Sequence, residues 1–187
     1  QSEYGPRALG NRSILADPRR PEMTSILNSR VKHREGFRPF APSVIETEAN
    51  TYFEMPFPGP YMNIAAPVRP EFRKLIPAVT HVDGSCRPQT VTQNQNKDYY
   101  DLIAAFGEET GVYCIINTSF NDNGEPIVET PEDALRSFRR TNIDYLFIDD
   151  QLVWRAEGVS VDRSIPLSDS VKDERFRGPL CQYCDVK

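Results

Sequence analysis

The stretch Val112-Tyr-Cys-Ile-Ile116, followed directly by Asn117-Thr-Ser-Phe-Asn-Asp-Asn-Gly124, decides the fold of this chain. A continuous apolar run of this length is typical of a strand that is buried on both faces of a sheet. The polar residues after it are typical of a loop at the carboxyl end of such a strand, where α/β sheets usually bind ligands. The segment therefore predicts a central strand with a binding loop that contains Asn117 and Ser119.

Helices are predicted on both sides of this strand in the sequence. The first is marked by residues with the i, i+3, i+4, i+7 spacing of an amphipathic helix: Tyr99, Leu102, Ile103 and Phe106. We expect this helix to stop at Gly111, because glycine commonly ends helices. A second helix over 131–141 is indicated by Thr130 as its N-cap and by Pro131 at its first position.

Shorter elements are predicted around these three. Pro21 and the spacing of the apolar residues that follow indicate a helix over 21–32, which carries Lys32 at its carboxyl end. Prolines push the residues before them toward extended conformations, so 38–45 is predicted to be extended. Further strands are expected within 62–68, at 89–92 and, as a hairpin, at 145–148 and 152–154.

The order of these elements indicates the fold class. Strands and helices alternate without a steady β-α-β rhythm, which predicts an α/β fold with a mixed sheet. A length of 187 residues fits one domain with a single core. No apolar run approaches the about 20 residues of a membrane span, so we expect a soluble, cytoplasmic protein with no membrane partner.

Basic charge is concentrated at the start of the chain. The first forty residues hold eight Lys or Arg against four Asp or Glu, whereas the whole chain has a net charge of -5. A local excess within an acidic chain indicates a dedicated anion site. Arginine forks hold phosphate oxygens in pairs, and the acidic total argues against a nucleic-acid partner, so phosphate is the expected anion.

Three polar clusters are candidates for this site. They are the cations Arg7, Arg12, Lys32 and Arg38, the segment 81–89 with Arg87, and the pair Asn117 and Ser119. Each cluster lies in or beside a predicted loop. Asn and Ser add neutral hydrogen-bonding groups that can fix a planar amide-like group or a phosphate oxygen. Together the clusters predict a phosphate-ester site.

Metal and nucleophile sites have weaker support. His33 and His81 form no H-E-x-x-H pattern, so we expect no metal site. A Cys86–His81 pair stays open, as does a zinc or redox role for Cys181-Gln-Tyr-Cys184, although a C-terminal docking segment is the preferred interpretation. The sequence has neither G-x-x-x-x-G-K-[ST] nor G-x-G-x-x-G, so any nucleotide is held by a different arrangement.

The two ends of the chain suggest its organisation. Because the chain opens almost directly on a dense motif over 3–13, we expect it to be a piece of a longer protein whose N-terminal part supplies a second activity. The apolar pattern fades from about Gly158, which predicts a polar tail over 158–187 that docks onto the rest of the protein.

Four motifs carry a resemblance to a known family. They are Glu3-Tyr-Gly-Pro-Arg-Ala-Leu-Gly-Asn-Arg-Ser-Ile-Leu-Ala-Asp-Pro18, Arg34-Glu-Gly-Phe-Arg-Pro-Phe-Ala-Pro-Ser43, His81-Val-Asp-Gly-Ser-Cys-Arg-Pro-Gln-Thr-Val91 and Asn117-Thr-Ser-Phe-Asn-Asp-Asn-Gly-Glu-Pro-Ile-Val128. In this order they resemble the C-terminal domain of the NodU/TobZ-like carbamoyltransferases, which carbamoylate nodulation factors, aminoglycosides and related natural products. The resemblance runs from Glu3 to about Arg155.

The resemblance implies a fold and an activity. The fold would be a YrdC-like twisted mixed β-sheet flanked by helices, with a basic concave face, over residues 1–157. This domain would take ATP, accompanied by Mg²⁺, and carbamoyl phosphate as substrates and form carbamoyl adenylate. Its partner would be the N-terminal transferase domain of the same protein, which passes the carbamoyl group to an acceptor.

The resemblance also implies the site residues. Carried over motif by motif, Arg7, Arg12, Arg87, Asn117 and Ser119 bind ATP or carbamoyl phosphate, and Lys32 and Arg38 are catalytic. Cations fixed in advance stabilise the negative charge that spreads when pyrophosphate leaves. His81 and Gln89 are candidates for supporting positions. The alternative to catalysis is a nucleotide-binding or anion-binding module that regulates an attached domain.

Overall fold

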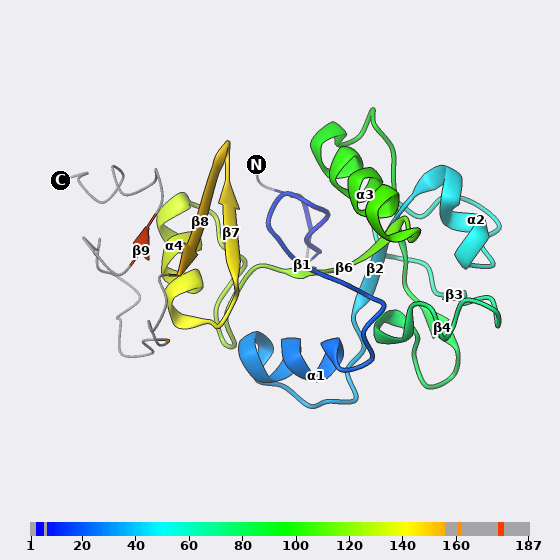
Figure 1. The fold of residues 1–187 in the computed structure, drawn as a ribbon, viewed down its shortest axis with the longest axis horizontal. Helices are drawn as coiled ribbons and strands as arrows, with labels where there is room; N and C mark the ends of the chain where they lie inside the picture. The colour runs from blue at the N-terminus through cyan, green and yellow to red at the C-terminus, as the bar shows by residue number, and fades with distance from the viewer. Residues whose placement is uncertain (1–2, 6, 156–160, 162–175, 178–187) are drawn as a thin grey trace. The chain divides into compact units, whose positions relative to one another are not determined.

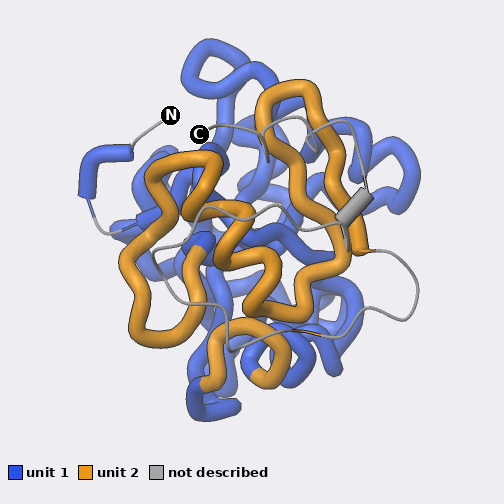
Figure 2. Tube along the Cα trace, turned by 90° about the vertical axis from the view of Figure 1, so that its left-hand side faces the viewer, with its two compact units in different colours: residues 1–28, 34–120 blue, residues 29–33, 121–187 orange. Residues whose placement is uncertain are grey.

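A computed structural model describes residues 3–5, 7–155, 161 and 176–177 of the chain. They belong to two compact units, coloured separately in Figure 2. Unit 1 comprises residues 1–28 and 34–120, and unit 2 comprises residues 29–33 and 121–187. The chain length predicted a single core, so the division into two units differs from that expectation. Cys181 and Cys184 lie outside the described residues, as does most of the predicted tail over 158–187.

Unit 1 is built on a four-stranded sheet (Figure 1). The strand order is β1 (Ser13–Ala16), β6 (Cys114–Ser119), β2 (Ala41–Ile45) and β5 (Gln89–Val91). Strand β6 is antiparallel to both of its neighbours, and β5 is parallel to β2. The strand predicted from the apolar run 112–116 is therefore β6, which lies inside the sheet. The predicted mixed α/β class is confirmed.

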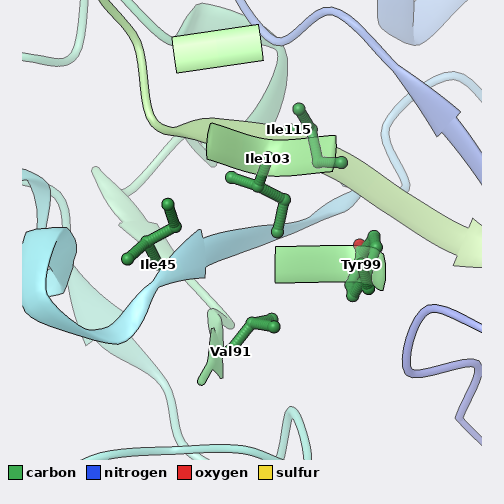
Figure 3. Packing of buried hydrophobic residues seen from close by; sticks show 5 residues of the cluster. All are labelled: Ile45, Val91, Tyr99, Ile103 and Ile115. Atoms are coloured by element: carbon green, nitrogen blue, oxygen red, sulfur yellow. The ribbon is translucent and has the colours of Figure 1, made fainter. Parts of the chain in front are cut away.

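Helix α3 (Lys97–Thr110) covers half of one face of this sheet. Side chains alternate between the two faces along a strand, so residues two apart share a face. The apolar cluster on the α3 side, shown in Figure 3, consists of Ile45, Val91, Tyr99, Ile103 and Ile115, all at most 4% exposed. Burying one such side chain stabilises the fold by roughly 1.5–3 kcal/mol. This cluster therefore fixes α3 on the sheet.

The carboxyl end of α3 agrees with the prediction, but one residue of its stripe does not. Asn96 caps the helix by accepting a hydrogen bond from the Tyr99 N–H at 3.1 Å, and Gly111 ends it with φ 76°. Leu102 was placed on the apolar stripe and is instead 47% exposed. The buried row runs along the i, i+4 positions through Ile103, and Leu102 lies to one side of that row.

Polar side chains occupy the other half of the same sheet face. Ser43, Gln89 and Asn117 each lie two residues from a member of the apolar cluster along their strands, and all are at most 4% exposed. Ser43 Oγ donates to Gln89 Oε1 at 2.7 Å. Asn117 Nδ2 donates to Gln89 Oε1 at 2.9 Å and to Ser43 Oγ at 3.1 Å. These three residues, termed the amide clamp, join strands β2, β5 and β6 through buried hydrogen bonds.

The N-terminal loop covers the amide clamp. Asn117 Nδ2 donates to the carbonyl oxygen of Ala8 at 3.2 Å, and Gln89 Nε2 donates to that of Leu9 at 2.8 Å. Glu3 Oε1 closes the loop by accepting from the Leu9 N–H at 2.7 Å. A buried polar group that loses its partner costs about 1–3 kcal/mol, so these bonds tie the loop firmly to the sheet.

Short elements complete the first 120 residues. Helix α1 (Met23–Leu27) continues into the π-helix η1 (Asn28–Lys32), so the helix predicted over 21–32 is present but irregular in its second half. The strand predicted within 62–68 is only β3 (Ala66–Pro67), which pairs with β4 (Ser85–Cys86). The other short helices are η2 (Glu46–Glu48), α2 (Ala49–Tyr52) and η3 (Pro77–Val79).

Unit 2 contains the predicted helix and hairpin. They are α4 (Pro131–Arg140), β7 (Tyr145–Ile148) and β8 (Gln151–Arg155), with β9 (Phe176–Arg177) paired to β8. Thr130 caps α4 in a capping box with Asp133, and Asp149 makes the hairpin turn with φ 49°. Leu146 and Val153, which pair with each other across the hairpin, are buried.

Gly10 is the position where the N-terminal loop tolerates no side chain. Its φ is 119°, and a Cβ there would overlap the ring of Tyr99. We expect Gly10→Ala to lower the free energy of unfolding by about 2–5 kcal/mol, because a left-handed backbone costs roughly 1–2 kcal/mol and overpacking roughly 1–3 kcal/mol. Urea denaturation measures this change. Gly36→Ala is the control, since nothing lies within 4 Å of a Cβ at Gly36, and an equal loss in both variants would contradict the packing argument.

Candidate anion-binding site

Three arginine side chains from separate segments of unit 1 line one small hollow. Arg7 comes from the N-terminal loop, Arg34 from the segment before β2, and Arg87 from the link between β4 and β5. The rest of the wall is formed by Ala8, Pro39, Phe40, Ala41, Met62, Asn117, Thr118 and Ser119. The volume is about 120 Å³, the space of roughly four water molecules. This cavity, termed the anion hollow, has the size of a small anionic group.

The charge around the anion hollow is positive. None of the described residues on its wall is Asp or Glu. Burial lowers the pKa of Arg87, and repulsion from Arg7 lowers it further. Burial likewise lowers the pKa of Arg34, with repulsion from Arg38 adding to it and Glu35 opposing it. The main cause of both shifts is the removal of each guanidinium from water, and repulsion between neighbouring arginines is the smaller cause. A negative ligand in the hollow would interact favourably with several cations at once.

Arg87 carries a second sign of an unmet partner. Its Nε is buried and has no hydrogen-bond partner among the described residues. A buried charged donor without an acceptor is costly, and hydrogen bonds to charged groups contribute roughly 1.5–3 kcal/mol when they form. The Arg87 guanidinium is therefore suited to an anionic ligand.

Arg34 is the member of the site that the sequence interpretation left out. Its Nε donates to Asn28 Oδ1 at 2.9 Å, and its guanidinium carbon lies 4.6 Å from the centre of the Phe40 ring. These two contacts hold the side chain in one orientation beside the hollow. The sequence could have indicated Arg34, because it is the first residue of the motif 34–43. From that motif, only Arg38 was predicted as a site residue.

Asn117 and Ser119 line the anion hollow, but not from a loop as predicted. Both belong to β6, because pairing with β1 continues as far as Ser13 opposite Ser119. The Asn117 amide nitrogen is already committed to the amide clamp and to Ala8. The predicted binding roles of Asn117 and Ser119 stay predictions.

Two of the predicted arginines do not line the hollow and instead contact carboxylates. Arg12 Nε lies 3.7 Å from Glu3 Oε2, and its Nη2 donates to the Glu3 carbonyl oxygen at 3.3 Å. Arg38 Nε lies 3.1 Å from Glu35 Oε2, with both side chains more than half exposed. Arg38 is nonetheless close enough to Arg34 to affect its pKa.

Lys32 belongs to unit 2, as does Asn121, the residue it contacts. Its side chain is buried, and Nζ donates to Asn121 Oδ1 at 2.7 Å and to the Asn121 carbonyl oxygen at 3.3 Å. These contacts fix the ammonium group on the segment that follows β6. The catalytic role predicted for Lys32 stays a prediction.

A larger cavity shares Arg7 with the anion hollow. Its volume is about 680 Å³, within the roughly 300–1,000 Å³ of small-molecule sites. The exposed rings of Tyr4 and Tyr61 border it. Its amide side chains are Asn11, Gln89, Gln95 and Asn96. The combination of aromatic rings and amides suits a ligand with a flat polar ring, and Arg7 connects such a ligand to the anion hollow.

Other kinds of site find no support in the described part of the chain. Cys86 is fully buried and burial raises the pKa of its thiol, which argues against a Cys86–His81 nucleophile. Burial also lowers the pKa of His81, whose Nδ1 lies 3.5 Å from Ser85 Oγ. Among the described residues, no three His, Cys, Asp or Glu side chains gather to hold a metal ion. None of the described helices combines the length and apolar character needed to cross a bilayer.

The chain matches known proteins over the whole region that contains these cavities. Nodulation protein NolNO of Sinorhizobium fredii is 52% identical over 156 residues, covering 82% of this chain and 23% of that protein. Uncharacterized protein MJ1058 of Methanocaldococcus jannaschii is 50% identical over 153 residues, covering 82% and 25%. Nodulation protein NolO of Bradyrhizobium diazoefficiens is 47% identical over 156 residues, covering 82% and 28%. The chain thus spans about a quarter of the length of these relatives.

A family model agrees with these relatives. The model of the carbamoyltransferase C-terminus matches residues 1–155, which include β1 to β8 and every described residue of both cavities. The family that the sequence motifs resembled is therefore confirmed. The chain belongs to the family of carbamoyltransferase C-terminal domains.

Proposed function

We propose that this chain activates a carbamoyl group by forming carbamoyl adenylate from ATP and carbamoyl phosphate, and that an N-terminal domain of the full-length protein then transfers the group to an acceptor. We also propose that its sheet is of the YrdC-like type, with the anion hollow on its basic concave face. Membership of the carbamoyltransferase C-terminus family supports this function.

One observation carries the proposal most directly. Three guanidinium groups line a hollow of about 120 Å³ whose described wall holds no carboxylate. Planar guanidinium forks match the oxygens of phosphate, and several of them together neutralise a doubly charged group. The phosphate of carbamoyl phosphate has this charge and this size.

The two cavities suggest where the two substrates bind. We assign carbamoyl phosphate to the anion hollow and the nucleoside part of ATP to the larger cavity, between the tyrosine rings and the amides. Arg7 lines both cavities, so its guanidinium can contact the ATP phosphates and carbamoyl phosphate at the same time. This arrangement would bring the carbamoyl group close to the α-phosphate, which is what adenylate formation requires.

The chemistry balances in two steps. Water hydrolyses carbamoyl phosphate, which breaks the bond between the carbamoyl group and the phosphate and yields carbamate, inorganic phosphate and a proton. A carbamate oxygen then bonds to the α-phosphorus of ATP while the bond to the β-phosphate oxygen breaks, so pyrophosphate leaves with its electron pair. Mg²⁺ accompanies ATP and offsets charge on its phosphates. The arginines need no covalent intermediate, since their fixed positive charge stabilises the negative charge that develops on the phosphate oxygens.

A regulatory module that binds the same ligands without turnover is the second candidate. It is favoured by the partnering of Arg12 and Arg38 with Glu3 and Glu35, which leaves fewer cations for transition-state charge. Both candidates require anion binding, so turnover separates them. Only the first candidate, an enzyme that forms carbamoyl adenylate, requires catalytic roles for Lys32 and Arg38.

Substitutions on the hollow test anion binding. We expect Arg87→Ala and Arg34→Ala each to weaken carbamoyl phosphate binding by about tenfold or more, because a hydrogen bond to a charged group contributes roughly 1.5–3 kcal/mol. Isothermal titration calorimetry measures the affinity. Arg20→Ala removes the same charge from an exposed residue that pairs with Glu22 and should leave the affinity unchanged. Equal affinity in all three variants would reject the anion hollow as the site.

Exchange of labelled pyrophosphate into ATP tests the reaction. We expect exchange by the 187-residue chain, alone or mixed with the separately produced N-terminal domain, only when carbamoyl phosphate is present. Arg38→Ala and Lys32→Ala should reduce the exchange rate by more than they reduce ATP affinity, because they would act on transition-state charge. If ATP binds but no carbamoyl-phosphate-dependent exchange appears in either mixture, the regulatory module becomes the better description.

A further inference from the structure

We infer that the amide clamp of Ser43, Gln89 and Asn117 positions Arg7 for its ligands, and that Gln89 is a positioning residue for anion binding although it does not line the anion hollow. This inference rests on the proposed function insofar as Arg7 binds a phosphate. The clamp itself is a matter of hydrogen-bond geometry. Its effect on Arg7 can therefore be tested separately from the reaction.

The clamp holds the backbone immediately after Arg7. Asn117 Nδ2 donates to the Ala8 carbonyl oxygen at 3.2 Å, and Gln89 Nε2 donates to the Leu9 carbonyl oxygen at 2.8 Å. A backbone carbonyl can only accept, so these two bonds fix which end of each amide faces the loop. Ser43 Oγ then donates to Gln89 Oε1 at 2.7 Å, which agrees with the same orientation.

Burial makes this orientation hard to replace. Ser43, Gln89 and Asn117 are at most 4% exposed, so water cannot readily supply a lost bond. The side chain of Arg7, in contrast, is exposed. Its place beside both cavities therefore depends mainly on the backbone that carries it, and that backbone is held by the clamp.

The position of Gln89 allows a selective test. Gln89 borders the larger cavity but is not on the wall of the anion hollow. A small anion bound in the hollow would therefore be sensitive to Gln89 only indirectly, either through the loop that carries Arg7 or through Asn117, which lines the hollow and donates to Gln89. An effect that passes through the loop is lost once Arg7 is removed, whereas one that passes through Asn117 persists. Inorganic phosphate is a suitable probe, because it carries the relevant charge and does not need the larger cavity.

The experiment is a double-mutant cycle with phosphate affinity as its readout, measured by calorimetry on the full 187-residue chain. We expect Gln89→Met to weaken phosphate binding by about tenfold, similar to Arg7→Ala, and the double variant to bind no more weakly than Arg7→Ala alone. Losses that multiply in the double variant would overturn the inference.

A stability control and a ligand-free readout complete the design. Ile103→Val loosens the core of Figure 3 without touching the clamp and should lower the melting temperature while leaving phosphate affinity unchanged. Hydrogen exchange of the Leu9, Gly10 and Asn11 amides, which donate to Glu3 and Ser13, should accelerate by about tenfold in Gln89→Met but not in Ile103→Val. Unchanged hydrogen exchange of these amides in Gln89→Met would overturn the inference that the clamp orders the loop. If the wild-type chain bound no phosphate, the proposed function would fail. The hydrogen-exchange rates of the loop amides would still show whether the amide clamp orders the loop.

Discussion

Like charges gathered around one small hollow repel each other, so the fold of unit 1 must hold its arginines in place. It does so with a different anchor for each. The backbone after Arg7 is bonded to the amide clamp, and Arg34 is held by Asn28 and the Phe40 ring. Arg87 lies on the short link between two strands, β4 and β5. Because the scaffold supplies this ordering in advance, a ligand would not have to organise the cations itself.

The same constraint explains the division of labour among the basic residues. The chain is acidic in total, and several of its arginines are neutralised locally, as in the contacts of Arg12 with Glu3 and of Arg38 with Glu35. The arginines on the anion hollow have no such carboxylate on its described wall. The positive charge around the hollow is therefore local, because the chain as a whole is acidic.

Sequence patterns predicted the elements well and the site less completely. The apolar run of β6, the end of α3 at Gly111, the Thr130 cap of α4 and the hairpin all follow from local propensity, which the sequence contains directly. Local propensity does not indicate that Arg34 lines the hollow whereas Arg12 contacts Glu3, because this depends on how the chain folds back toward Glu3. The meeting of Ser43 with Gln89 likewise depends on the register of β2 and β5, which are far apart in sequence. Nothing in the spacing of polar residues indicates that register.

The position of the amide clamp shows what the sheet gives up for the site. Residues on the same face build an apolar cluster with α3, and apolar residues in place of Ser43, Gln89 and Asn117 would extend that cluster. Replacing buried polar groups with well-packed apolar ones is often neutral or stabilising, so stability alone does not require these side chains. An apolar surface, however, could not bond the carbonyl oxygens of Ala8 and Leu9. The polar half of the sheet is thus the half that can bond the backbone of the loop that carries Arg7.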